Sequence, residues 1–179
     1  VYLCSFSSDG TRYVLCAKYS AQLYDSATRQ PIGQPLRHDE SIYTATFSPD
    51  GRTLLTTSWD HTARCWNCVT GDPLGRFQHE GRVYMGSYSP DALRIVTASE
   101  DGTARLWSPW RGELAEPMRH QAPVVSASFT PDGRYVVTNA GGTVRRWLLG
   151  ATPVEAANIS DAEEIETISE LAALSPTGT

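Results

Sequence analysis

Several features that would define a function are missing from this sequence. No run approaches the roughly 18 consecutive apolar residues of a membrane-spanning helix, so we expect no membrane partner. The first residues hold no basic segment followed by an apolar one, so no secretion signal is expected. No glycine-rich phosphate-binding loop of the P-loop or dinucleotide type occurs. We therefore expect no cofactor and no metal.

Basic residues are scarce and unevenly placed. The chain has 15 Lys+Arg against 20 Asp+Glu, and the only lysine is Lys18. All of the basic residues lie in residues 1–150, whereas residues 151–179 contain six acidic residues and no basic one. The nearly neutral first part creates no field that attracts nucleic acid. A nucleic-acid partner is not expected.

The four cysteines show no pattern of a metal or redox site. Cys65 and Cys68 form a Cys-x-x-Cys, but zinc needs a second pair, and a redox pair needs a helix N-terminus beside it. Cys4 and Cys16 lie in predicted strands and have no ligand spacing. Unpatterned cysteines are typical of a reducing cytoplasm. We predict free thiols and a cytoplasmic location.

What the sequence does contain is a repeat with a period of 41 residues. An aromatic residue followed by a short turn motif with Asp occurs four times, at 6–10, 47–51, 88–92 and 129–133. The aspartates of these motifs are 41 residues apart, and so are His38, His79 and His120. A fixed period of this length indicates a repeat architecture.

Each repeat has the pattern of four short strands. A run rich in β-branched and aromatic residues, such as 42–47, leads into a Pro-Asp-Gly turn, and two further strands and a more polar fourth one follow. Four strands per repeat are typical of one β-propeller blade. The sequence therefore predicts an all-β propeller segment over residues 1–150. Its four blades are expected at about 1–37, 38–78, 79–119 and 120–150.

The pattern resembles the WD-repeat family over about residues 1–150, and bacterial WD-repeat proteins in particular. Residues 99–107, Ser-Glu-Asp-Gly-Thr-Ala-Arg-Leu-Trp, are the best match, and 58–66 follow closely. The resemblance implies a structural tetrad of His, Thr, Asp and Trp in the regular blades. The tetrads map onto His38, Thr56, Asp60 and Trp66, onto His79, Thr97, Asp101 and Trp107, and, without the aspartate, onto His120, Thr138 and Trp147.

The first and fourth repeats depart from the family pattern. One residue is missing from the turn that would hold the tetrad aspartate of the fourth repeat. In the first repeat Tyr24 stands in place of Trp, and Leu15 in place of Thr. The Trp-Asp pair that names the family is absent throughout. These departures predict that tetrad contacts hold blades 1 and 4 less firmly, but the 41-residue register is kept.

Recurrent Thr, His and Asp could also be mistaken for a hydrolase triad. An enzyme needs one such site, whereas this set recurs with a Trp once per blade. Triads are recognised by geometry and not by residue type. Within a blade the indole N–H can bind Thr, Thr can bind His, and His can bind Asp, as buried polar groups require. We therefore interpret the tetrads as structural, and we predict no enzyme activity.

Partner binding is expected on one face. In propellers of this family the start of the first strand and the residue before the tetrad Asp face the top surface, where partners commonly dock. Those positions here hold residue types that dominate interface hot spots: Tyr2, Tyr43, Trp59, Arg82, Tyr84 and Glu100. Aromatic residues can simply fill strand positions, but a tryptophan in a turn, such as Trp59, is hard to explain as core.

The acidic tail, residues 151–179, predicts a short helix at about 161–174. Ser160 and Glu163 have the spacing of a capping box, and Pro176 prevents continuation. Ile165 and Ile168 recur at helical spacing with later apolar residues. Packing on the last blade is the ordinary interpretation of such a helix, and docking of a partner is the alternative.

We interpret the chain as a scaffold that binds other proteins or peptides. One alternative is a sensor or regulatory portion of a larger bacterial signalling enzyme such as a Ser/Thr protein kinase. Another is a catalytic propeller, but no unrepeated cluster of titratable residues supports it. The sequence opens at Val1 within a strand pattern, from which we expect a piece of a longer chain. Four blades leave apolar faces at both ends, so additional blades from a longer chain or a second copy are expected.

Overall fold

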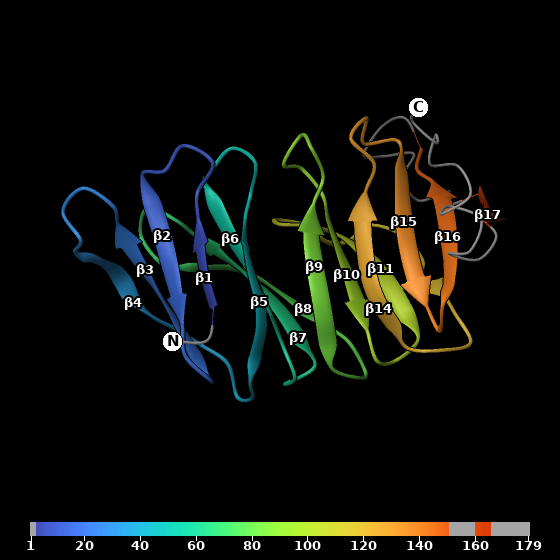
Figure 1. The fold of residues 1–179 in the computed structure, drawn as a ribbon, viewed down its shortest axis with the longest axis horizontal. Helices are drawn as coiled ribbons and strands as arrows, with labels where there is room; N and C mark the ends of the chain where they lie inside the picture. The colour runs from blue at the N-terminus through green and yellow to red at the C-terminus, as the bar shows by residue number, and fades with distance from the viewer. Residues whose placement is uncertain (1–2, 151–159, 166–179) are drawn as a thin grey trace, which may run out of the picture.

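Four antiparallel sheets stand side by side in the computed structural model, which describes residues 3–150 and 160–165 (Figure 1). The first sheet, blade 1, is built from β1 (Leu3–Phe6), β2 (Arg12–Cys16), β3 (Ser20–Asp25) and β4 (Pro31–Arg37). Blade 2 is built from β5 (Ile42–Phe47), β6 (Thr53–Ser58), β7 (Thr62–Asn67) and β8 (Pro73–Gln78). Neighbours in sequence are neighbours in each sheet.

Blades 3 and 4 follow the same plan with changes in the outermost strand. Blade 3 consists of β9 (Val83–Tyr88), β10 (Ile95–Ser99) and β11 (Thr103–Ser108), and its fourth strand is split into β12 (Gly112–Glu113) and β13 (Met118–Arg119). Blade 4 consists of β14 (Val124–Phe129), β15 (Tyr135–Ala140), β16 (Thr143–Leu148) and β17 (Ser160–Ile165). The predicted all-β architecture of four-stranded blades is confirmed.

The helix expected at 161–174 is wrong over its described part, because residues 160–165 form strand β17. This strand pairs antiparallel with β16 and supplies the fourth strand of blade 4. The register sets Ile165 opposite Val144, the position that Leu36, Phe77 and Met118 occupy in the other blades. Pairing with the open edge of β16 thus competes with the helical pattern and prevails. The rest of the expected helix, 166–174, lies outside the described residues.

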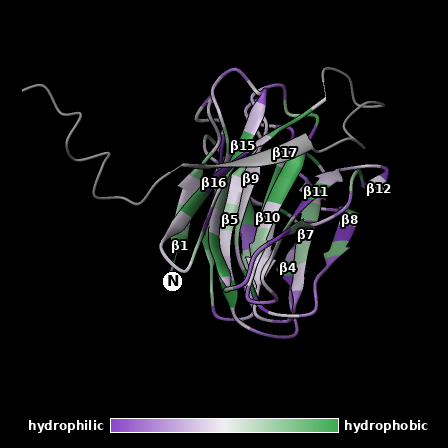
Figure 2. Cartoon of the chain, turned by 90° about the vertical axis from the view of Figure 1, so that its right-hand side faces the viewer, coloured by the Kyte–Doolittle hydropathy of each residue, from purple (hydrophilic) through white to green (hydrophobic). Residues whose placement is uncertain are grey.

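The cores lie between the sheets and not within them. Three clusters of buried residues fill the junctions of blades 1 and 2, of blades 2 and 3, and of blades 3 and 4. Burial decreases outwards: every residue of β10 is buried, whereas most of β8 is exposed or half-buried. Figure 2 shows the same change from hydrophobic green on β10 to hydrophilic purple on β8. Each blade therefore depends on its neighbours for its core.

The turn between the first two strands is closed in the same way in each blade. In blade 2 the Ser48 hydroxyl donates to the Asp50 carboxylate over 2.6 Å and accepts from the Thr53 amide over 3.0 Å. Gly51 completes the turn with φ of 67°. Blade 3 places Ala92 there with φ of 60°, in the left-handed region that L-residues rarely adopt. The motif predicted as a turn is thus a hydrogen-bonded unit.

Candidate functional site

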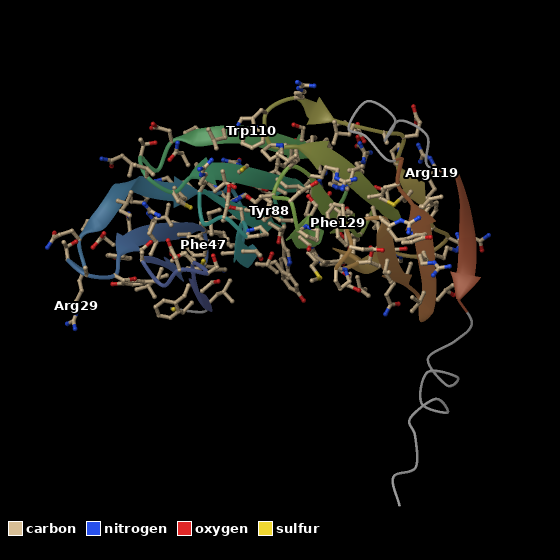
Figure 3. The ribbon with its side chains drawn as sticks, turned by 90° about the horizontal axis from the view of Figure 1, so that it is seen from above. Arg29, Phe47, Tyr88, Trp110, Arg119 and Phe129 are labelled. Carbon is tan, nitrogen blue, oxygen red and sulfur yellow. The ribbon has the colours of Figure 1, made fainter. Side chains whose placement is uncertain are left out.

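The predicted docking residues gather at one end of the blades. We call this end the top face: it is where the second strand of each blade turns into the third, at the lower edge of Figure 1. Tyr43 and Tyr84 lie near the starts of β5 and β9, and Trp59 lies in the turn between β6 and β7. Figure 3 shows the molecule from the opposite end, where the Pro-Asp-Gly turns lie. Tyr2 lies outside the described residues.

Two aromatic contacts join blade 2 to blade 3 on the top face. The ring centroids of Tyr43 and Tyr84 are 5.8 Å apart and tilted by 60°. The guanidinium carbon of Arg82 lies 4.5 Å from the centroid of the Trp59 ring. Tyr43 is 53% exposed and Trp59 37%, so both rings remain available for contact. The structure therefore brings these residues into one patch across a blade junction.

Glu100 completes this patch. Its carboxylate lies 3.9 Å from Nε of Arg82 and accepts from the Arg82 amide over 3.4 Å. Burial of Tyr84 and the nearby charge of Glu100 raise the pKa of the tyrosine, so its hydroxyl stays protonated at neutral pH. We name Tyr43, Trp59, Arg82, Tyr84 and Glu100 the top-face patch.

A hollow of about 290 Å³ adjoins the patch on the side of blade 1. Its lining consists of Lys18, Ser41, Ile42, Tyr43 and Trp59. The Trp59 amide donates to the Ser41 carbonyl over 3.0 Å, which fixes the turn against the start of β5. Apolar walls with a few polar groups are the usual lining of a recognition site.

Lys18 was missed by the sequence reasoning. It lies 41 residues before Trp59, which in turn lies 41 residues before Glu100, so the repeat itself marks all three as equivalent turn positions. The irregular first repeat hid this equivalence. The Lys18 ammonium lies 4.8 Å from the centroid of the Tyr19 ring. Equivalent turns of blades 1, 2 and 3 thus present a cation, an aromatic ring and an anion.

The tetrad residues of blades 2 and 3 form hydrogen-bonded chains. In blade 2 the Trp66 indole donates to the Thr56 hydroxyl over 2.9 Å, and this hydroxyl lies 2.7 Å from Nε2 of His38. The other imidazole nitrogen lies 2.9 Å from the Asp60 carboxylate. In blade 3 the same contacts join Trp107, Thr97, His79 and Asp101 at 2.8, 2.7 and 2.9 Å. Within these two tetrads every polar side chain has a hydrogen-bond partner.

The tetrad aspartates are held ionised. Burial disfavours the charge of Asp60, but hydrogen bonds from His38 and Thr62 outweigh it and hold the pKa well below its usual range. Arg64 adds an ion pair to the same carboxylate at 3.1 Å. Asp101 has the same pattern, with burial opposed by bonds from His79 and Thr103. The hydrogen bonds of these carboxylates are made to structural partners within the blade, which does not favour binding of a substrate.

Blades 4 and 1 show what happens when tetrad members are lost. In blade 4 the Trp147 indole donates to Thr138 over 2.9 Å, and Thr138 lies 3.1 Å from Nε2 of His120. Without a carboxylate, burial and the charge of Arg145 lower the pKa of His120 to about 4. In blade 1 Tyr24 stacks on Tyr13 at 5.1 Å instead of forming a tetrad.

The cysteines are all free, as predicted. Cys65 lies in the core between blades 2 and 3, and Cys68 in the core between blades 1 and 2. Burial raises the pKa of Cys68 to about 12, so it stays a thiol at neutral pH. Among the described residues no cluster of three His, Cys, Asp or Glu could hold a metal, and no helix could cross a membrane.

The blades, their inter-sheet cores and the repeated tetrads define a β-propeller repeat protein. Family models agree: the model "WD domain, G-beta repeat" matches residues 29–67, 71–108 and 113–147, more than half of the chain. The chain therefore belongs to the WD-repeat family.

Two curated relatives carry the same repeats. "WD repeat-containing protein 1" of Gallus gallus is 34% identical over 39% of this chain and 14% of that protein. The protein of the same name from Mus musculus is 34% identical over 40% of this chain and 12% of that protein. The matches thus span only a small part of these relatives. Both are vertebrate, so the resemblance to bacterial proteins stays a prediction.

A solved structure shows the same fold. The crystal structure of the computationally designed Ika8 protein superposes with a TM-score of 0.74 and 21% identity. The match covers 89% of this chain and 48% of the designed chain. At this identity the likeness concerns the fold alone.

Proposed function

We propose that this chain is a cytoplasmic protein-interaction scaffold that binds a partner protein or peptide through the top-face patch. The observation that carries the proposal is the contact of Arg82 with the exposed ring of Trp59. This contact holds two hot-spot residue types in place before a partner arrives. Pre-organised aromatic and arginine side chains cost little entropy on binding.

The arrangement of the patch supports recognition of a chain segment. Tyr43 and Tyr84 extend the apolar surface across the junction of blades 2 and 3, and Glu100 orients Arg82. The hollow beside Trp59 offers room for one side chain, with Lys18 at its edge. A partner with an apolar residue beside an acidic one fits this combination.

Catalysis is not part of this proposal. The tetrads recur in two blades with the same distances, and their hydroxyl, imidazole and carboxylate groups are bonded to one another. A nucleophile that donates to its own structural chain and has no open position beside it does not meet the geometric requirements of a triad. WD-repeat scaffolds bind other proteins, which agrees with the patch as the working surface.

The test is a quantitative pull-down with the double variant Tyr43→Ala plus Trp59→Ala. We expect the double variant to lose at least about 2 kcal/mol of binding energy for each hot-spot residue removed, or about 30-fold in affinity for each. Trp110→Ala is the matched control, because Trp110 is 60% exposed and lies in the turn before β12 at the opposite end of the blade. Recovery of the same partners in equal amount by a normally folded double variant would show that the patch is not the docking site.

A further inference from the structure

The start of β9 presents two side chains of the top-face patch at the spacing of an extended chain. Arg82 is exposed and Tyr84 is half-buried, whereas Val83 between them is fully buried. This alternation sets Arg82 and Tyr84 on the same side, roughly 7 Å apart along the backbone. A peptide that binds in extended form has the same spacing between its own alternate side chains. Two of its side chains can therefore contact Arg82 and Tyr84 at the same time.

The backbone beneath Arg82 is held by the tetrad turn of blade 3. The Glu100 amide donates to the Arg82 carbonyl over 2.9 Å. A Cβ added at Gly81 would lie 2.8 Å from the Asp101 amide nitrogen, so this close approach requires glycine. The Asp101 carboxylate in turn accepts from the Glu80 amide over 3.0 Å. The structural network of the blade thus fixes the positions of Arg82 and Glu100 relative to one another.

The guanidinium of Arg82 has one edge that faces solvent. Its carbon lies 4.5 Å from the centroid of the Trp59 ring, and Nε lies 3.9 Å from the Glu100 carboxylate. Neither Nη1 nor Nη2 donates a hydrogen bond to another residue in the part of the chain that the structure describes, and the side chain is 46% exposed. Two parallel N–H groups of this kind match the two oxygens of a carboxylate.

Glu100 decides which anion this edge favours. Its charge opposes that of Arg82, so the pair attracts an anion from a distance only weakly. A phosphate monoester carries nearly two charges at neutral pH, and removal of its water costs more than removal of water from a carboxylate. The weak net field does not offset this extra cost. A carboxylate can form the same two hydrogen bonds at a smaller cost, so it is the favoured group.

Apolar side chains form a row beside Arg82. Tyr43 and Tyr84 have ring centroids 5.8 Å apart, and Tyr43 is 53% exposed. Val125 holds the equivalent position in blade 4 and is 50% exposed. The three lie near the starts of β5, β9 and β14, which stand next to one another in Figure 1 and are in contact in sequence order. An aromatic or large aliphatic side chain fits against this row, because its burial there removes apolar area from water.

We propose that the top-face patch binds an extended peptide segment in which Glu or Asp stands two residues from an aromatic or large aliphatic residue. The carboxylate accepts from both Nη groups of Arg82, and the apolar side chain packs on Tyr84 and Tyr43. This assignment rests on the proposed docking function and adds to it the chemistry and the spacing of the ligand. The contacts that carry it lie at the junction of blades 2 and 3, inside the row of blades.

An array of seven-residue peptides tests the charge and the spacing. Each peptide carries Glu, Gln or phosphoserine at one position and Tyr, Leu or Ala one, two or three residues away, in a background of Gly and Ser. We expect the strongest binding for Glu with Tyr or Leu two residues away. Replacement of Glu by Gln should weaken binding at least about 10-fold, because charge-assisted hydrogen bonds are lost. Equal binding of the Gln peptides, a preference for phosphoserine, no effect of spacing, or no binding at all overturns the proposal.

Arg82→Lys tests the two-pronged contact, with the best Glu peptide and fluorescence anisotropy. Lysine keeps the charge but lacks the planar fork, so the affinity should fall at least about 10-fold. Arg52→Lys is the matched control, because the Arg52 side chain is 85% exposed in a turn at the opposite end of blade 2. Equal affinity of a folded Arg82→Lys variant and the wild type overturns the proposal.

Glu100→Gln tests the choice between carboxylate and phosphate. Glutamine keeps an oxygen that can accept from the Arg82 amide, but it removes the opposing charge. The ratio of phosphoserine-peptide affinity to Glu-peptide affinity should then rise at least about 10-fold, because the second charge of the phosphate is no longer opposed. A purely structural role of Glu100 would leave this ratio unchanged, and that result overturns the proposal.

The pull-down with Tyr43→Ala plus Trp59→Ala separates this proposal from the proposed function. If the peptide array fails while the double variant still loses its partners, the patch is the docking site and the assigned ligand class is wrong. If the folded double variant keeps its partners, the docking function itself is wrong, and the assignment of a ligand to the patch falls with it.

Discussion

Blades 3 and 4 contain the same chain of tryptophan, threonine and histidine, but only blade 3 ends it on a carboxylate. In blade 3 His79 lies 2.9 Å from Asp101, and Trp107 is 5% exposed. In blade 4 the turn holds Gly141 and Gly142 instead, and His120 has no carboxylate partner among the described residues. One missing turn residue therefore leaves the imidazole neutral and the tryptophan half-buried. In blade 3 the aspartate accepts hydrogen bonds from the turn residue Thr103 and contacts His79, so it joins the turn to the histidine.

Removal of the tryptophan should give the largest difference in stability loss between the two blades. Trp107→Ala deletes a nearly fully buried side chain, and such truncations cost about 3–5 kcal/mol. Trp147→Ala should cost clearly less, because Trp147 is only half-buried and its network is already incomplete. Denaturant unfolding measures both values. Equal losses for the two variants would contradict the view that the carboxylate tightens the blade.

Loss of the carboxylate should have the next largest effect. Asp101→Ala leaves His79 and the Thr103 hydroxyl without their acceptor, at about 1–3 kcal/mol. The folded fraction should still bind partners, because Asp101 takes no part in the top-face patch. The converse change, an aspartate inserted between Gly141 and Gly142, should raise the unfolding midpoint of blade 4. A variant of unchanged stability that loses binding would mean that Asp101 belongs to a functional site.

Much of this comparison could be predicted from the sequence, because a fixed period sets which residues are equivalent. The 41-residue register predicted the blades. The resemblance to the WD-repeat family then implied which residues form the tetrads and which side chains lie at the top of blades 2 and 3. The contact of Arg82 with Trp59 could not be derived in this way, since it crosses a blade boundary and depends on how two sheets pack.

The tail shows where the sequence pattern misleads. The spacing of Ile165 with later apolar residues favours a helix, but it takes no account of an edge strand that lacks a partner. Blade 4 has only three strands before Gly150, and open edges attract further strands. The register then matters more than local propensity, and Ile165 takes the fourth-strand position of the other blades. Counting strands per blade would have pointed to this outcome.

The smallest effect expected is a difference in the response of the two blades to pH. The pKa of His120 is lowered to about 4 by burial and Arg145, below its ordinary value of about 6.5. The unfolded chain then binds a proton more readily, so stability from this group is complete above about pH 6.5 and is lost as the pH falls toward about 4. The pKa of Asp101 is lowered too, but its contribution is lost only as the pH falls below the ordinary aspartate value of about 3.9. Blade 4 should therefore weaken at a higher pH than blade 3. Hydrogen exchange measured blade by blade between these pH values detects the difference, and an NMR titration gives the pKa of His120 directly.

Insertion of the aspartate between Gly141 and Gly142 should raise that pKa, because a carboxylate beside the imidazole favours its charged form. An unchanged titration in a folded insertion variant would show that the missing aspartate does not account for the behaviour of His120.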